Sequence, residues 1–142
     1  MKAALFKAVG EPLAIEDLPD PEPRDGEVVI RVARCGVCGT DLHSTSGHGY
    51  TLPTGAQLGH EYAGEVVAVG RGVERLKRGD RIAALPVVGC GDCDACRTGI
   101  DVLCSRWTGY GGGLADYARV RERRATILPQ TLSLADGPLV EP

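Results

Sequence analysis

Aromatic residues are scarce in this chain of 142 residues, which has one Trp, one Phe and four Tyr. Long apolar runs are also lacking, and no uncharged stretch approaches the roughly 20 residues that a membrane-spanning helix needs. In the opening segment, MKAALFKAVGEP, two lysines enclose four apolar residues. A secretory signal requires a longer apolar run, of roughly 7 to 15 residues. We therefore expect a cytoplasmic protein with no membrane partner.

An excess of basic residues is absent as well. Sixteen Lys and Arg against nineteen Asp and Glu give a net charge of −3, which excludes the electrostatic footprint of a nucleic-acid-binding protein. The chain has no internal repeat or low-complexity tract, and 43% of its residues are hydrophobic. These features predict one globular domain over residues 1–142.

Turn-forming residues, by contrast, are frequent. Twenty Gly and nine Pro separate short runs of β-branched residues, which predicts a mainly β fold with short helices. Strands are expected at residues 3–7, 26–35, 61–70, 79–85 and 114–128. Residues 39–47, GTDLHSTSG, predict a short helix that Thr40 or Asp41 caps and Gly47 ends. A further helix start is expected at Ser133, and the stop at Pro142 soon afterwards is typical of a piece of a longer protein.

Four of the six cysteines lie close together, with two, two and seven residues between them: Cys90, Cys93, Cys96 and Cys104. This spacing lets the thiolates converge on one tetrahedral ion. Reduced thiols of a cytoplasmic protein favour metal over the alternative of disulfides or separate thiols. The aspartates of the segment would repel phosphate, which argues against a nucleic-acid-binding zinc ribbon. Because four cysteine ligands leave no open position, residues 89–105 are expected to form a structural zinc lobe.

A second group of ligand-type residues occurs in CGVCGTDLH, residues 35–43, and LGHEYAG, residues 58–64. Cys38, His60 and Glu61 are candidates for a catalytic zinc site, which needs about three protein ligands and one open position. A histidine among glycines is also typical of a turn, so the spacing alone leaves both interpretations open. Cys35 is expected to pack on its strand as a small hydrophobic residue.

Several motifs together resemble the zinc-dependent medium-chain alcohol dehydrogenases. They are GVCGTDLH, LGHEYAGEVVAVG followed by LKRGDRIA, the four-cysteine segment, GGLADYARV and LVEP, in that order. The part of the family that they resemble is the N-terminal catalytic domain, a GroES-like β-barrel, in the polyol, threonine and glucose dehydrogenase branch. The resemblance spans the chain and implies that fold.

The resemblance also implies a set of catalytic zinc ligands. Cys38 and His60 match two of the ligands, and Glu61 matches a neighbouring carboxylate that binds the ion or exchanges with water. Glu141 matches the carboxylate that completes the site in this branch. Asp41 matches a carboxylate that orients the histidine ligand.

The resemblance also implies that Gly39, Thr40 and His43 contact the cofactor. The resemblance gives Thr40 and His43 the task of passing the alcohol proton to solvent through the cofactor ribose. Without the surrounding motif, Thr40 would be interpreted as a helix cap and His43 as a residue on a solvated face.

The implied activity is that of a zinc-dependent NAD(P) alcohol or polyol dehydrogenase. Zinc would polarise the alcohol as an alkoxide, and hydride would pass to the nicotinamide of NAD or NADP. The expected partners are a small-molecule alcohol and further copies of the chain in a homo-oligomer. GYGGGL has Leu114 where the last glycine of GxGxxG would stand, so the Rossmann domain is absent here. This chain alone is therefore not expected to transfer hydride.

Two other classes share the expected barrel: a non-catalytic GroES-like binding module and a zinc-free quinone or enoyl reductase. Bound metal would distinguish them from the dehydrogenase. Trp107 and Tyr110 are expected to pack against the lobe, although either could line a substrate pocket. The basic run RVRERR, residues 119–124, is expected on a solvated strand edge.

Overall fold

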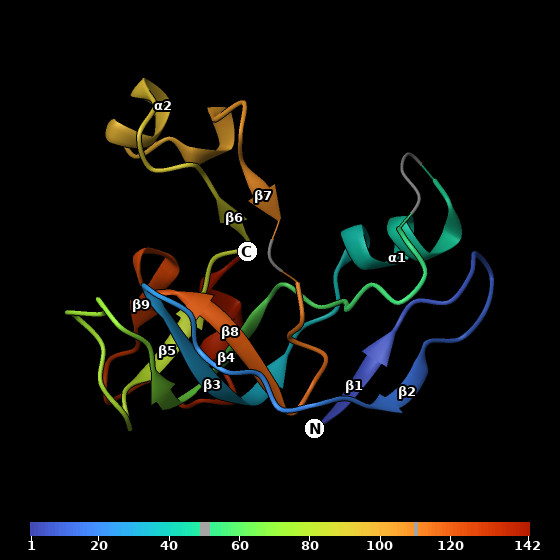
Figure 1. The fold of residues 1–142 in the computed structure, drawn as a ribbon. Helices are drawn as coiled ribbons and strands as arrows, with labels where there is room; N and C mark the ends of the chain where they lie inside the picture. The colour runs from blue at the N-terminus through green and yellow to red at the C-terminus, as the bar shows by residue number, and fades with distance from the viewer. Residues whose placement is uncertain (49–51, 110) are drawn as a thin grey trace.

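The fold is built on a five-stranded antiparallel sheet with the strand order β8-β3-β4-β5-β9 (Figure 1). The computed structural model describes residues 1–48, 52–109 and 111–142. The strands of this sheet are β3 (Glu27–Cys35), β4 (Tyr62–Val69), β5 (Arg81–Ala84), β8 (Tyr117–Arg121) and β9 (Ala125–Ile127). Irregular pairing of β3 with β4, at Val29/Ile30 and again at Val32/Arg34, adds local bend and twist to the sheet.

A hairpin of β1 (Lys2–Leu5) and β2 (Ala14–Asp17) forms a second, two-stranded sheet. Isolated bridges join Ala3 to Ala115 and Leu5 to Gln57, so β1 is tied to two distant segments of the chain. The strands predicted at 3–7, 26–35, 61–70 and 79–85 occur as β1, β3, β4 and β5, each within two residues of its expected ends. The predicted mainly β fold is therefore confirmed.

The core lies against the five-stranded sheet, where β-branched and small residues alternate inwards. Its buried members include Val28 and Ile30 from β3, Tyr62 and Val66 from β4, and Ile82 from β5. Cys35 packs against this cluster as a partly buried residue, as the sequence predicts. Burial, together with the nearby Asp41 and Glu61 carboxylates, raises the pKa of the Cys35 thiol to about 12.

The predicted short helix is α1 (Gly39–Ser46), and Gly47 ends it in a left-handed conformation with φ 76°. The N-cap residue is Cys38 and not Thr40 or Asp41, although the Asp41 side chain contributes to the cap from the first turn. The Cys38 thiol accepts the Thr40 N–H at 3.3 Å, and the Asp41 carboxylate accepts the Cys38 N–H at 3.1 Å. This reciprocal arrangement satisfies N–H groups that the first turn would leave free.

Residues 85–109 leave the main sheet and contain the four clustered cysteines. Figure 1 shows this part of the chain projecting on β6 (Val87–Val88) and β7 (Thr108–Gly109), with α2 (Asp94–Arg97) at its far end. The 3₁₀ turn η1 (Asp101–Leu103) follows α2, and η3 (Gly137–Val140) precedes the C-terminus. No helix among the described residues is long and apolar enough to cross a membrane.

Candidate metal centres and active-site cleft

Cys38 and His60 are brought together from the start of α1 and the loop before β4. Their Sγ and Nε2 atoms lie 3.2 Å apart, and a carboxylate oxygen of Asp41 completes a group whose ligand atoms are all within 4.8 Å of one another. A thiolate and an imidazole nitrogen are ligands that zinc prefers. The donor set therefore fits the ion that the sequence predicts here.

Asp41 is the buried member of this group, with 6% of its surface exposed. One carboxylate oxygen accepts the Cys38 N–H, and the other lies 3.6 Å from Nδ1 of His60. A carboxylate beside Nδ1 favours the tautomer that keeps Nε2 free to bind a metal. Asp41 thus contacts both candidate ligands, which is the orienting position implied by the resemblance.

Glu61 and Glu141 form a second group with His60. Ligand atoms of these three residues lie within 4.8 Å of one another, although Glu141 is 80 positions from Glu61 in the sequence. His60 thus belongs to both candidate groups. The four predicted ligands of the catalytic ion are therefore gathered around one histidine, and their role as ligands stays a prediction.

The predicted cofactor-side residues lie on the first turns of α1. Gly39, Thr40 and His43 are all exposed. The ring of His43 meets that of His48 edge to face, with centroids 6.3 Å apart. Thr40 lines the cleft described next, whereas Gly39 and His43 are not among its lining residues.

A cleft of about 800 Å³ opens beside Cys38 and His60. Its volume lies within the usual range of small-molecule sites, about 300 to 1,000 Å³. Trp107 lines it with 53% of its surface exposed, in agreement with the alternative that this residue lines a pocket. Tyr110 falls outside the described residues. Sequence reasoning missed several other lining residues, which no motif marks: Ser44, Leu52, Gln57, Pro86 and Val87.

The four cysteines of the predicted lobe form a second group, with all sulfur atoms within 4.8 Å of one another. Sγ of Cys93 lies 3.5 Å from that of Cys96. The backbone N–H groups of Cys90 and Arg106 lower the pKa of the Cys104 thiol, against the effect of burial, to about 6. Four converging sulfurs, one of them with a lowered pKa, fit a closed tetrahedral zinc site.

Asp101 connects this cysteine segment to the main sheet, a role that the sequence did not reveal. Its buried carboxylate accepts the Gly89 N–H at 2.7 Å and pairs with Arg123 at 3.3 Å and with Arg124. Burial lowers the pKa of the Arg124 guanidinium, and the nearby Cys96 opposes that effect. The expectation of a solvated basic run is therefore wrong at Arg124, whose side chain is 15% exposed, whereas Arg123 is exposed as predicted. The sequence offered one signal for this ion pair, namely two adjacent arginines together with a cysteine segment rich in aspartate.

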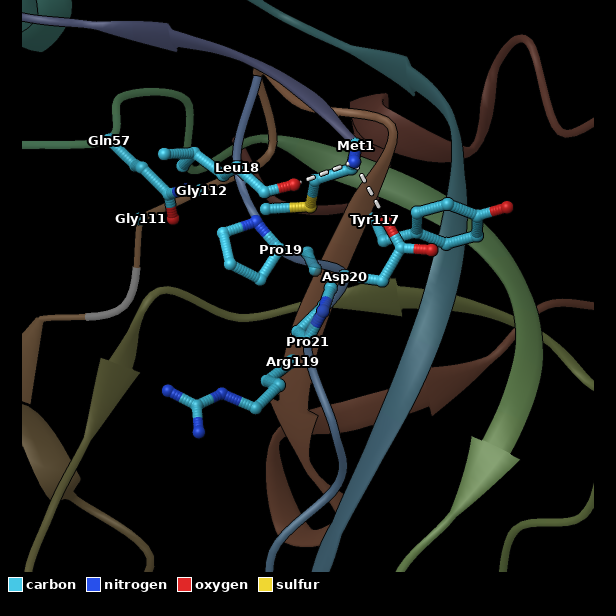
Figure 2. A pocket seen from close by; sticks show the side chains of 11 residues that line it. Met1, Leu18, Pro19, Asp20, Pro21, Gln57, Gly111, Gly112, Tyr117 and Arg119 are labelled. Carbon is cyan, nitrogen blue, oxygen red and sulfur yellow. Dashed lines mark hydrogen bonds and ion pairs between the residues drawn. The ribbon is translucent and has the colours of Figure 1, made fainter. Parts of the chain in front are cut away.

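A second pocket of about 390 Å³ lies beside the N-terminus (Figure 2). The Met1 ammonium donates to the Leu18 carbonyl and to Asp20, each at 2.8 Å. Gln57 and Gly111 border both this pocket and the cleft beside His60. None of the site residues predicted from the sequence lies in it.

Comparison with known proteins gives a family match and close relatives. The model of the alcohol dehydrogenase GroES-like domain matches residues 24–130. Sorbitol dehydrogenase of Bacillus subtilis is 39% identical over 150 residues, covering all of this chain and 42% of that protein. L-threonine 3-dehydrogenase of Saccharopolyspora erythraea is 38% identical, covering 89% of this chain and 39% of that protein.

A solved structure agrees with these relatives. An alcohol dehydrogenase of Escherichia coli CFT073 in complex with NADH superposes with a TM-score of 0.88 at 34% identity, covering 99% of this chain and 42% of that one. The chain therefore belongs to the zinc-type medium-chain alcohol dehydrogenases and has the fold of their GroES-like domain. It spans about two fifths of the length of the relatives it matches. The described residues contain no Rossmann domain, in agreement with the prediction.

Proposed function

We propose that this chain is the catalytic domain of a zinc-dependent NAD(P) alcohol dehydrogenase. The observation that carries the proposal is the approach of Cys38 Sγ to His60 Nε2, 3.2 Å apart at the side of a large cleft. A zinc ion held there would supply Lewis-acid polarisation of the substrate oxygen. In the overall reaction, the alcohol loses hydride to NAD(P)⁺ and a proton to solvent, and a carbonyl compound and NAD(P)H form.

Cys38, His60, Glu61 and Glu141 are the residues proposed to hold the ion. Asp41 would keep the His60 ring in the orientation and tautomer that binding needs. The N–H of Thr40 donates to the Cys38 sulfur at 3.3 Å and so helps to hold this sulfur at the start of α1. The chain's own contribution is thus a ligand set that is oriented before the ion binds.

Thr40 and His43 are proposed to carry the alcohol proton away from the cleft. The Thr40 hydroxyl is on the cleft wall, and His43 follows on the exposed side of α1. Because the two residues are three positions apart on a helix, their side chains are neighbours on its surface. An imidazole ring can both accept and donate a proton, so His43 suits the final transfer to solvent.

The cysteine segment is proposed to hold a second, structural zinc. Four thiolates fill a tetrahedral shell, so no position is left for substrate. A non-catalytic GroES-like module or a zinc-free reductase would have no use for the first group of ligands. The number of bound metal ions therefore separates the three functions.

The decisive measurement is the zinc content of the purified chain, together with NAD(P)H formation by the complete protein that contains it. We expect about two zinc ions per chain. Cys38→Ser should remove one ion and lower kcat/KM by about 10³-fold or more, because the lost ligand belongs to the reacting centre.

Cys96→Ser is the matched control. It should remove the other ion and act on stability first, because its sulfur belongs to the closed site. If the parent chain binds one zinc ion and Cys38→Ser still binds it, the chain has a structural zinc site but no catalytic one. No bound zinc at all would contradict the mechanism.

A further inference from the structure

The cleft beside His60 is largely apolar. Its apolar side chains come from separate parts of the chain. Leu52 and Leu58 precede β4 in the sequence. Pro86 and Val87 lie at the start of the cysteine-bearing segment, and Trp107 lies near its end. Lysine and arginine are absent from the described residues that line the cleft, while the carboxylates of Asp41 and Glu141 are present. A phosphate group would find no cationic partner on these walls.

Few polar groups of the cleft are available to further hydroxyls of a substrate. Asp41 already contacts the Cys38 N–H and His60, and the Ser44 hydroxyl is 2% exposed and donates to the Thr40 carbonyl. His60 and Glu141 are proposed metal ligands, and Thr40 serves the reacting hydroxyl. Among the lining residues that the structure describes, the Gln57 amide is what remains, and it has no side-chain hydrogen bond to another described residue.

From this lining we infer that the substrate is a neutral alcohol bearing an aromatic or bulky alkyl group next to the reacting carbon, in preference to a polyol or a sugar phosphate. The inference rests on the proposed function. Hydroxyl groups of a polyol would lose water on entering the cleft and would meet apolar walls, which is unfavourable. An apolar substituent instead gains from leaving water.

Trp107 is the residue to which the geometry assigns this preference. It presents a large, rigid apolar surface to the cleft, with 53% of its area uncovered. A substrate ring placed against the indole would bury area on both partners and could stack on it. Trp107 is thus proposed as a specificity-determining residue.

Because Trp107 is the only tryptophan, the fluorescence of the zinc-loaded chain reports on the cleft directly. We expect 1-phenylethanol to change the emission in a saturable way, with half-saturation of the order of millimolar. Propan-2-ol, sorbitol and sorbitol 6-phosphate should need concentrations about 10-fold higher or more. Leu103→Ala removes an exposed apolar side chain outside the cleft and should respond like the parent chain.

The second arm measures kcat/KM of the complete protein with the same alcohols and NAD or NADP. We expect 1-phenylethanol to exceed propan-2-ol by about 100-fold, a discrimination within the range of apolar pockets. Trp107→Ala should lower that ratio about 10-fold or more, and Trp107→Phe should keep it within about 3-fold. A merely structural role would lower both rates together and leave the ratio unchanged.

The outcomes separate the two levels of the proposal. A protein that oxidises sorbitol or its phosphate better than 1-phenylethanol is still a dehydrogenase, and the inferred substrate class is then wrong. The same holds if Trp107→Ala leaves the ratio unchanged. A protein that reduces neither NAD nor NADP with any of these alcohols contradicts the proposed function itself.

Discussion

Gly36 lies against the side chain of Glu61, one of the proposed ligands. Its N–H donates to the Glu61 carbonyl at 2.7 Å. A methyl group at Gly36 would overlap Glu61 Oε2 and come within 3.2 Å of Glu61 Cβ. The missing side chain of Gly36 therefore gives the Glu61 carboxylate the space that it occupies beside His60.

We predict that Gly36→Ala weakens metal binding at this centre by about 10- to 100-fold, the range found when groups that orient ligands are changed. The measurement is competition with a chromophoric zinc chelator. Gly39→Ala is the control, because a methyl group there meets its nearest neighbour, Cδ2 of His43, only at 3.9 Å.

A double mutant separates this positioning effect from a loss of folding. Glu61→Ala removes the obstructing carboxylate, so adding Gly36→Ala to it should cost little further affinity. Additive losses in the double mutant would show that Gly36 acts on something other than Glu61.

The sequence predicts the site residues that belong to a motif better than those that do not. Cys38, His60 and the four clustered cysteines could be singled out because ligand chemistry restricts residue type and spacing. Trp107 and Gln57 could not, because apolar and amide side chains serve any surface or core. Their place in the cleft depends on how β6, β7 and β1 pair with distant segments, and a local pattern does not carry that information.

At the level of elements, the strand predicted at 114–128 is interrupted by the 3₁₀ turn η2 (Glu122–Arg124). Strand-like residues continue through the turn, so local propensity did not reveal it. The Glu122 carboxylate accepts the N–H groups of Glu74 and Arg75, at 3.0 and 2.5 Å, and that of Leu76 at 3.0 Å. These partners are more than 45 positions away in the sequence, and the turn separates β8 from β9.

Glu122 gives this turn a defined pH dependence. Burial opposes ionisation of the carboxyl, but the N–H groups of Arg75, Glu74 and Leu76 outweigh it and lower its pKa below 4.5. A lowered pKa in the folded state contributes stability above the unfolded pKa, and this contribution is lost as pH falls through the folded value. Acidification should therefore loosen the η2 turn.

We predict that Glu122→Gln lowers the free energy of unfolding by about 1 kcal/mol at pH 7 and reduces its loss between about pH 5 and pH 3. Urea unfolding across this pH range measures both effects. Glu11→Gln, at an exposed glutamate near the β1–β2 loop, should leave both the free energy and its pH dependence within error. Parallel pH profiles for the parent and Glu122→Gln would contradict the role of the carboxylate.

At the scale of the whole molecule, the two candidate metal sites belong to different parts of the fold, and Asp101 links those parts. The four clustered cysteines belong to the projecting segment (Figure 1), whereas Cys38 directly precedes α1 and His60 lies just before β4. Arg123 and Arg124 belong to η2 of the sheet, and they meet Asp101 and the Gly89 carbonyl of the segment. Pro86 and Val87, which line the cleft beside His60, directly precede this contact.

Asp101→Asn should therefore loosen the whole cysteine segment and the cleft wall attached to it. The amide can still accept the Gly89 N–H, but Arg124 keeps a buried charge without its counter-charge, and breaking such a pair costs about 3 kcal/mol or more. We expect faster hydrogen exchange over residues 86–104 and faster zinc release from the four cysteines. Asp94→Asn, on the same segment but fully exposed and paired only with Arg97 at 3.4 Å, should stay within about 0.5 kcal/mol of the parent. If both variants release zinc at the parent's rate, the segment is held by its own metal site and Asp101 does not position it.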